Sequence, residues 1–313
     1  MKTVFMFSGQ GAQYAGMGKD LYDHYPVAKE IFDRADAVLG YSIKDICFQD
    51  EAKLGETEFA QPAILTMSIA AMKVLEEQGV RADMTAGLSL GEYSAYVASG
   101  AMDFEEAVAL VQKRGKFMAE AVPSGEGAMY AIIGLDTELV EEACSEATAE
   151  IGGLAVPANY NAPGQIVIAG KAEAAARAAE LAKEKGAKMA VKLKVSGPFH
   201  TELLQPAADK LGPELQKMHI SPMKIPVYTN VNAEVVASEQ DIIPILTRQI
   251  CCPVRWETIV RNMAEAGADT FIELGPGKTL NGFVKRIIKG VVNVNVEDSS
   301  SLEKTMSKLN DAV

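Results

Sequence analysis

Short apolar runs alternate with helical patterns along most of this 313-residue chain, and this alternation constrains the fold more than any other feature. Strands that are separated by helices pair in parallel, because each helix returns the chain to the same end of the sheet. The sequence therefore predicts an α/β fold with a mostly parallel sheet. The expected strands are Thr3–Phe7, Met84–Leu88, Ile225–Thr229 and Thr270–Glu273, and the expected helices include Gln61–Gln78, Leu90–Ala98, Phe104–Ala121, Asp241–Ile250, Glu257–Ala266 and segments that begin at Glu202 and Lys278.

The middle of the chain follows a different order, β-α-β-β-α-β, which is typical of a ferredoxin-like domain. The turn sequence NAPG, Asn161–Gly164, separates two of its strands. Because the α/β rhythm resumes afterwards, we interpret residues 126–196 as a domain inserted into a larger one, which comprises residues 1–125 and 197–313. The expected elements of the insert are Gly127–Gly134, Thr137–Ala149, Gly153–Tyr160, Gln165–Ala169, Lys171–Lys185 and Ala187–Val195.

Composition and charge argue against several classes of protein. The formal net charge of −12 disfavours general nucleic-acid binding, and no apolar run approaches the ~18 residues that span a bilayer. The N-terminal MKTVFMFSGQG is interpreted as a first strand and not as a signal peptide. The four cysteines lack C-x-x-C spacing, so neither disulfides nor a zinc site is predicted. We expect a cytoplasmic protein without a metal, a membrane contact or a nucleic-acid partner.

The sequence G-L-S-L-G places Ser89 between an expected strand and an expected helix. This context is that of a nucleophile elbow, the sharp strand-to-helix turn that exposes a catalytic serine. The amides at the start of the helix also suit a developing oxyanion. The alternative interpretation is an ordinary strand–turn–helix connection that happens to contain a serine.

A nucleophilic serine needs a base, and the chain has three histidines. His24 and His219 fit solvated positions near the ends of elements. His200 follows an expected strand and the Gly197–Pro198 break, where α/β folds place functional side chains. By elimination His200 is the candidate base, and a structural histidine is the alternative.

Arg114 lies on the helix that follows the elbow helix. It is either a surface arginine or a guanidinium that binds a substrate carboxylate through two hydrogen bonds.

Two glycine-rich segments do not match nucleotide motifs. The loop after the first strand has Tyr14 where a dinucleotide fingerprint needs glycine, and ELGPGKTL has Ile272 where a P-loop needs glycine.

With these pieces in place, the chain closely resembles the malonyl-CoA:acyl carrier protein transacylases, which load malonyl groups for fatty acid synthesis. Ordered blocks carry the resemblance from end to end. They are FSGQGAQYAGMG, GLSLGEYSA, KRGKFMAEAVP, NYNAPGQIVIAG, VSGPFHTELL, PVYTNVNA, CCPVRW and ELGPGKTL. The resemblance implies a hydrolase-like α/β large domain with an inserted ferredoxin-like small domain, in agreement with the order of elements read from the chain itself.

The resemblance also implies a role for each site residue and names the partners. Malonyl-CoA is the donor, the phosphopantetheine thiol of an acyl carrier protein is the acceptor, and a monomer without a bound cofactor is expected. The implied residues are Ser89 as nucleophile, His200 as acid/base, the amides of Gln10 and Leu90 as oxyanion hole, Arg114 for the malonyl carboxylate, Gln249 as the residue whose main-chain carbonyl orients His200, Asn161 in the cleft and Phe199 in malonyl selection.

One residue departs from the family pattern. The elbow usually reads G-H-S-L-G, and Leu88 replaces its histidine. The base comes from the distant GPFH block, so we expect the chemistry to persist. A serine thioesterase or esterase, an acyltransferase of a polyketide pathway and a non-catalytic acyl-CoA sensor are the alternative functions.

The segment Lys183–Lys194, KEKGAKMAVKLK, is a lysine cluster in an acidic chain. The carrier protein is expected to be acidic, so this segment is a candidate docking patch. The alternative is a solvent-exposed strand face, because Lys192 and Lys194 alternate with apolar residues.

Overall fold

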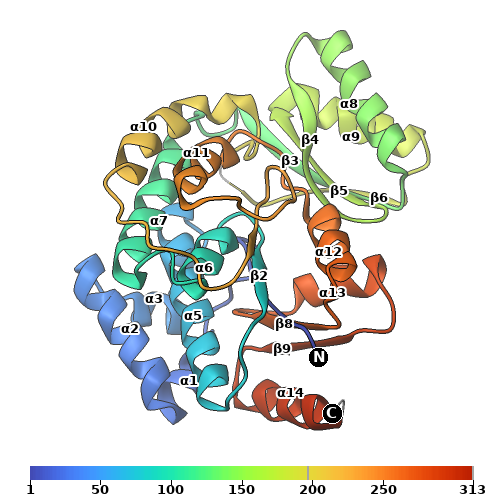
Figure 1. The fold of residues 1–313 in the computed structure, drawn as a ribbon. Helices are drawn as coiled ribbons and strands as arrows, with labels where there is room; N and C mark the ends of the chain where they lie inside the picture. Colours follow the sequence, from blue (N-terminus) through green and yellow to red (C-terminus); the bar gives the residue numbers. More distant parts are fainter. Residues whose placement is uncertain (196, 312–313) are drawn as a thin grey trace.

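Two β-sheets organise residues 1–195 and 197–311, the part of the chain that the computed structural model describes. The larger sheet is parallel throughout, which confirms the predicted α/β class. Its first strand lies in the middle of the sheet and is buried along its whole length (Figure 1). The strand order is β7 (Val227–Tyr228), β2 (Met84–Gly87), β1 (Thr3–Phe7), β8 (Thr270–Leu274) and β9 (Val292–Val296).

Helices cover both faces of this sheet, and the alternation within β1 shows why. Phe5 and Phe7 pack into the core on the side of α5, whereas Val4 and Met6 pack against α12 and α13. A parallel strand that is buried on both faces is apolar at nearly every position, as TVFMF is after Thr3. The helices are α1 (Lys19–His24), α2 (Pro26–Leu39), α3 (Ile43–Gln49), α4 (Glu51–Leu54), α5 (Thr57–Glu77), α6 (Gly91–Ala98), α7 (Phe104–Glu120), α10 (Gln205–Leu215), α11 (Glu239–Gln249), α12 (Trp256–Glu265), α13 (Thr279–Ile287) and α14 (Ser299–Asp311), with a 3₁₀ turn at Glu202–Leu204.

The second sheet is antiparallel and belongs to the small domain. The order β4-β5-β3-β6, with one helix after the first strand and one after the third, is the ferredoxin-like arrangement that the sequence predicts. The domain limits at 126 and 196 stay a prediction, and residue 196 lies outside the described residues. The elements are β3 (Gly127–Ile133), α8 (Thr137–Ile151), β4 (Ala155–Ala162), β5 (Gln165–Lys171), α9 (Ala172–Glu184) and β6 (Met189–Lys192).

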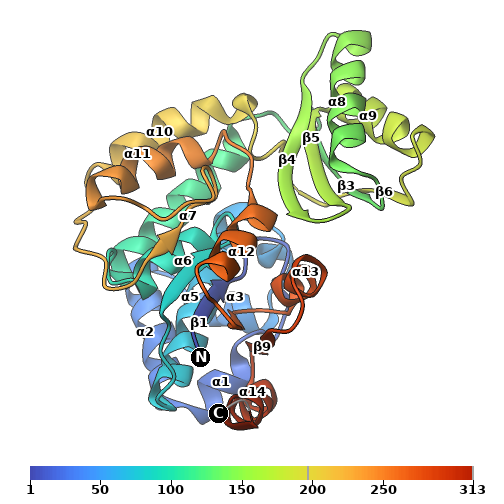
Figure 2. The ribbon, with the colours of Figure 1, turned by 45° about the vertical axis from the view of Figure 1, so that its right-hand side comes forward.

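The two helices of the small domain both lie on the side of its sheet that faces away from the large domain (Figures 1 and 2). Ile132, Ile166 and Ile168 form a core with these helices. On the opposite face, Met129 and Val167 join the core of the large domain. One face of the small sheet is therefore turned toward the large domain.

A short backbone bridge ties β4 to the large domain. The Tyr160 amide donates to the Val254 carbonyl at 2.8 Å, and the Val254 amide donates to the Ala158 carbonyl at 2.9 Å. These bonds extend the small sheet onto the segment that follows α11, and they fix β4 beside it. Asn161, which the sequence analysis placed in a turn, lies on β4 because that strand continues to Ala162.

Several elements were not predicted from the sequence. The helices α1 to α4 have mixed composition, and β9 alternates valine with asparagine as an edge strand does. None of the helices in residues 1–195 and 197–311 is both long and apolar enough to cross a lipid bilayer.

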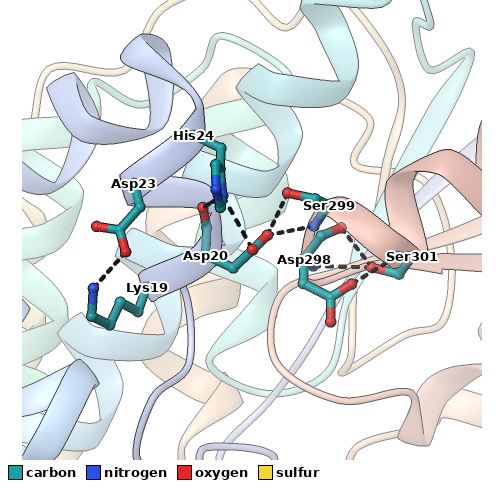
Figure 3. Close-up of polar contacts among 7 residues, drawn as sticks. All are labelled: Lys19, Asp20, Asp23, His24, Asp298, Ser299 and Ser301. Atoms are coloured by element: carbon teal, nitrogen blue, oxygen red, sulfur yellow. Dashed lines mark hydrogen bonds and ion pairs between the residues drawn. The ribbon is translucent and has the colours of Figure 1, made fainter.

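The N-terminal helix α1 caps the C-terminal helix α14 (Figure 3). The Asp20 carboxylate accepts hydrogen bonds from the amide and hydroxyl of Ser299, the first residue of α14. His24 lies 3.2 Å from the same carboxylate. Burial opposes ionisation of Asp20, but the Ser299 hydrogen bonds and the nearby His24 hold its pKa below the usual value. Asp20 thus joins the two ends of the chain.

We predict that Asp20→Ala destabilises the protein by about 1 kcal/mol at pH 7, since a helix cap is lost. A carboxyl group with a lowered native pKa stabilises the fold above its unfolded pKa of about 4. The difference from wild type is expected to shrink as the pH falls through the pKa of Asp20. Urea unfolding measures this, with Asp23→Ala as control because Asp23 pairs with the exposed Lys19. Equal losses in both variants would contradict the capping role.

Candidate active site

Ser89 occupies a strained turn between β2 and α6, as predicted for a nucleophile elbow. Its φ of 54° is uncommon for a residue other than glycine. The flanking glycines are required by close packing: a Cβ on Gly87 would lie 1.9 Å from the Gly91 carbonyl carbon, and one on Gly91 would lie 2.2 Å from the Phe7 oxygen. The two glycines therefore let the turn lie directly against β1.

His200 contacts the serine directly. Its Nε2 lies 2.7 Å from Ser89 Oγ, and its φ of 61° shows a second strained backbone in the site. Its Nδ1 faces the carbonyl oxygens of Gln249 at 3.0 Å and Cys252 at 3.2 Å. Both oxygens accept, so Nδ1 carries the proton and Nε2 is free to accept the proton of Ser89. Burial and the nearby Arg114 lower the pKa of His200 to about 4, which keeps the imidazole neutral at pH 7.

The side chain of Gln249 links the elements of the site. Its Oε1 accepts from Arg114 at 3.0 Å, and its Nε2 donates to the Ser89 carbonyl oxygen at 3.0 Å and to Glu92 at 2.7 Å. The residue is fully buried at the end of α11. Its main-chain carbonyl orients His200, so one residue contacts the nucleophile, the base and the guanidinium.

Two residues that the sequence analysis did not single out complete this network. The Asn230 side chain accepts from the Ser89 amide at 2.6 Å and donates to the Gly87 carbonyl at 2.7 Å. The carboxylate of Glu92, in the first turn of α6, accepts from the main-chain amide of Asn230 at 3.0 Å and also from the side chain of Gln249. Burial raises the pKa of Glu92 to about 7, although these donors favour its ionised form. The sequence signal that could have identified Glu92 is its position as a glutamate within the apolar run that follows the elbow.

Arg114 is buried beneath the serine and has only neutral partners. Its Nη1 donates to Gln61 Oε1 at 2.7 Å, and its Nη2 lies 3.2 Å from Ser89 Oγ. The guanidinium stacks 5.3 Å from the ring centroid of Tyr93, and its Nε has no hydrogen-bond partner among the described residues. Within the same part of the chain no carboxylate forms an ion pair with it. Burial lowers the pKa of Arg114, and the nearby Tyr93 and Glu92 offset this effect only in part.

A cavity opens at the serine between the two domains. Ser89, His200 and Gln10 lie on the large-domain side, and apolar side chains of the small sheet form the opposite wall. The loop with Gln10 follows β1, while Leu90 begins α6. Among the described residues neither the Gln10 nor the Leu90 amide donates a hydrogen bond, so both suit the predicted oxyanion hole.

The remaining predicted residues also line this cavity. Phe199 is almost buried beside His200, and Leu88 borders the cavity beside the nucleophile. The Oδ1 atom of Asn161 is buried and accepts no hydrogen bond from residues 1–195 and 197–311. An amide oxygen left in this state suits a ligand that donates a hydrogen bond.

No cluster of histidine, cysteine, aspartate and glutamate in the described part of the chain is arranged to hold a metal ion. The polar groups that meet at Ser89 are a serine, a neutral histidine, a cation and free amides. This set is able to form and hydrolyse or transfer an acyl ester.

Comparison with known proteins agrees with this chemistry. Residues 4–306 match the family described as acyl transferase domain. The malonyl CoA-acyl carrier protein transacylase of Bacillus subtilis is 47% identical over 99% of this chain and 98% of its own. The crystal structure of MCAT from Streptococcus pneumoniae has a TM-score of 0.93 and 51% identity, over 98% of this chain and 100% of its own.

A third relative was solved with a partner. The malonyl-transacylase PlMCAT, in complex with the type II PKS acyl-carrier protein AntF, has a TM-score of 0.95 and 42% identity over 98% of this chain and 100% of its own. These similarities extend over both domains and include the site. The chain belongs to the acyl transferase family, and within it to the malonyl CoA-acyl carrier protein transacylases.

Proposed function

We propose that this enzyme transfers a malonyl group from malonyl-CoA to the phosphopantetheine thiol of an acyl carrier protein in fatty acid synthesis. The observation that carries the proposal is Arg114, a buried cation 3.2 Å from Ser89 Oγ that lacks an anionic partner among the described residues. A buried charge of this kind favours a substrate that brings its own carboxylate to the nucleophile. Malonyl thioesters do so, and the names of the relatives agree.

In the first half-reaction, Ser89 Oγ bonds to the thioester carbonyl carbon while its proton passes to His200 Nε2. The amides of Gln10 and Leu90 hold the resulting oxyanion. The carbon–sulfur bond then breaks, and His200 returns the proton to the departing CoA thiolate. The product is a malonyl ester on Ser89.

In the second half-reaction, the carrier's thiol attacks the same carbonyl carbon and gives its proton to His200. The bond to Ser89 Oγ breaks, and the serine regains the proton. Ser89 and His200 therefore act twice in opposite directions, as a ping-pong transfer requires. The chain supplies every group in these steps, so we propose that no cofactor is needed beyond the pantetheine of donor and acceptor. We also propose that the enzyme acts as a cytoplasmic monomer.

Mass spectrometry of the intact protein after exposure to malonyl-CoA tests the proposal. Wild type is expected to gain the mass of one malonyl group, and Ser89→Ala none. Ser94→Ala is the matched control, because Ser94 lies on α6, the helix that follows Ser89, and its buried hydroxyl has no partner among the described residues. Addition of carrier protein should then move the malonyl group to the carrier's thiol. Release of free malonate instead would identify a thioesterase.

Arg114→Ala is expected to reduce malonyl transfer by about 100-fold, because the substrate carboxylate loses its buried partner. Acetyl transfer should fall much less, since the acetyl group has no carboxylate. Rates of Ser89 acylation by the two CoA esters measure this difference. Lys113→Ala, at an exposed neighbouring position, should leave both rates unchanged. Equal loss of both activities would count against the carboxylate-binding role.

Glu92 is expected to act as a positioning residue for Ser89 and Gln249. In Glu92→Ala the buried Gln249 Nε2 loses an acceptor, which costs about 1–3 kcal/mol and should slow Ser89 acylation roughly 10- to 100-fold. Glu92→Gln keeps an acceptor oxygen and should recover part of the rate. Single-turnover acylation measures both variants, and equal rates in the two would contradict the role.

Glu92 also makes the free energy of unfolding depend on pH. The native state holds the Glu92 proton up to about pH 7, whereas the unfolded state releases it near 4.5. The native state binds more protons in this window, so stability is expected to fall as the pH rises through it. Glu92→Gln should lack this component in urea unfolding between pH 5 and 8.

A further inference from the structure

We propose that Glu273, through its contact with Ser8, positions the oxyanion hole and thereby sets the rate of Ser89 acylation. Glu273 is the fourth residue of β8, and Ser8 directly follows the neighbouring strand β1. Both residues adjoin the active-site cavity, but Ser8 is only 1% exposed and Glu273 is fully buried. They are therefore positioning residues, which act through their neighbours. The inference rests on the proposed function, because it deepens the role given there to the Gln10 amide.

Strand register places Glu273 beside the start of residues 8–12, here called the oxyanion loop. Glu273 pairs with Met6 in the parallel sheet, so its side chain lies on the side of the sheet that α13 covers. Ser8 Oγ lies 3.4 Å from Glu273 Oε1 and 3.1 Å from the Pro276 carbonyl oxygen, and both oxygens can accept its proton. The first residue of the oxyanion loop is thus held by the end of β8 and by the turn after it.

The carboxyl group of Glu273 also holds the start of α13. Its Oε1 accepts from the Leu280 amide at 3.1 Å, and its Oε2 accepts from the Asn281 amide at 2.8 Å. Both amides belong to the first turn of the helix, where no carbonyl of the same helix is available to them. Leu280 lines the cavity that contains Ser89. One carboxyl group therefore joins the oxyanion loop to a wall of the cavity.

A carboxyl group is a costly choice for this position. Among the described residues no cation forms an ion pair with Glu273. Burial raises the pKa of Glu273 to about 7, although the two amides and the Ser8 hydroxyl favour its ionised form. A serine or asparagine cap would avoid the cost of burying a carboxyl group. A buried carboxyl group with a shifted pKa next to a nucleophile is typical of a functional role.

The oxyanion loop packs directly on the nucleophile elbow. A Cβ on Gly9 would lie 2.5 Å from the Leu88 carbonyl oxygen, so the two backbones are in contact. The side chain of Gln10 is held separately, by Thr57 at 3.0 Å, whereas its main-chain amide is held through Ser8. Release of Ser8 would let this amide shift relative to the nucleophile. An oxyanion-hole donor stabilises the transition state only at the correct distance, so a small shift lowers the rate.

Single-turnover acylation by malonyl-CoA tests this role. Ser8→Ala removes the hydroxyl group but leaves α13 capped, whereas Glu273→Ala removes both contacts. Each variant is expected to slow acylation about 10- to 100-fold at saturating malonyl-CoA. The concentration for half-maximal rate should change little, because the bound thioester does not yet carry the oxyanion.

Asp298→Ala is the matched control. Its carboxylate also caps a helix, since it accepts from the Ser301 amide at 2.7 Å in the first turn of α14. That helix lies at the end of the large domain that is distant from the small domain (Figure 1). Asp298→Ala should therefore lose stability and keep the wild-type rate of acylation.

Infrared spectroscopy of the malonyl ester on Ser89 gives a readout that a loss of stability alone does not move. Hydrogen bonds from the oxyanion hole polarise the ester carbonyl and lower its stretching frequency. An isotope-labelled carbonyl should therefore absorb at a higher frequency in Ser8→Ala and Glu273→Ala than in wild type or Asp298→Ala. The double variant of Ser8 and Glu273 should be no slower than Glu273→Ala, because both changes break the same contact.

A wild-type rate and carbonyl frequency in Ser8→Ala would overturn the proposal, even if Glu273→Ala fails to fold. Equal slowing in Asp298→Ala would also overturn it, as would rate losses that multiply in the double variant, because the effect would then not pass from Glu273 through Ser8. Each of these outcomes leaves the proposed function intact, since Ser89 still gains the malonyl group. A wild type that gains none contradicts the proposed function, and the positioning role falls with it.

Discussion

The hydrogen bonds of Gln249 are the interactions on which the rest of the site depends. Its carbonyl holds His200, its Oε1 holds Arg114, and its Nε2 holds both the Ser89 carbonyl and Glu92. An amide side chain suits this position because it accepts at one end and donates at the other. A carboxylate there would accept from Arg114 but would neutralise the cation and repel Glu92. The neutral amide keeps Arg114 in place and leaves its charge available to a substrate.

The parallel sheet explains how such distant segments meet. Ser89 follows β2, the Gln10 loop follows β1 and Asn230 follows β7, and the carboxyl ends of parallel strands lie at one edge of the sheet. His200 lies in the segment that follows β6, where the chain passes from the small domain back to the large domain. The insertion therefore builds the second wall of the cavity and delivers the base with the same connection. The two backbone hydrogen bonds between β4 and Val254 fix that wall beside the segment whose Cys252 carbonyl accepts from His200.

Much of this arrangement follows from sequence, and the exceptions have physical causes. Strong periodicity fixed the type and approximate limits of the buried strands, and the glycines at 87 and 91 marked the elbow because sterics allow nothing larger. The weakly patterned helices before α5 and the edge strand β9 gave no such signal. Glu92 and Asn230 were missed for a different reason. Their importance lies in contacts between the elbow with α6, the segment after β7 and α11, and a linear pattern does not contain contacts across 138 residues.

In the proposed function, the buried guanidinium selects the donor. Arg114 is held by neutral oxygens and an aromatic ring, so its charge is incompletely compensated until an anion arrives. A malonyl group on Ser89 would supply that anion within reach of Nη2 and stabilise the acylated enzyme. Departure of the malonyl group to water or to the acceptor thiol would leave the guanidinium unpaired in both cases, so this interaction accounts for selectivity and not for the preference for the thiol. We attribute that preference to the cavity wall of apolar side chains, which limits the water that competes with the thiol.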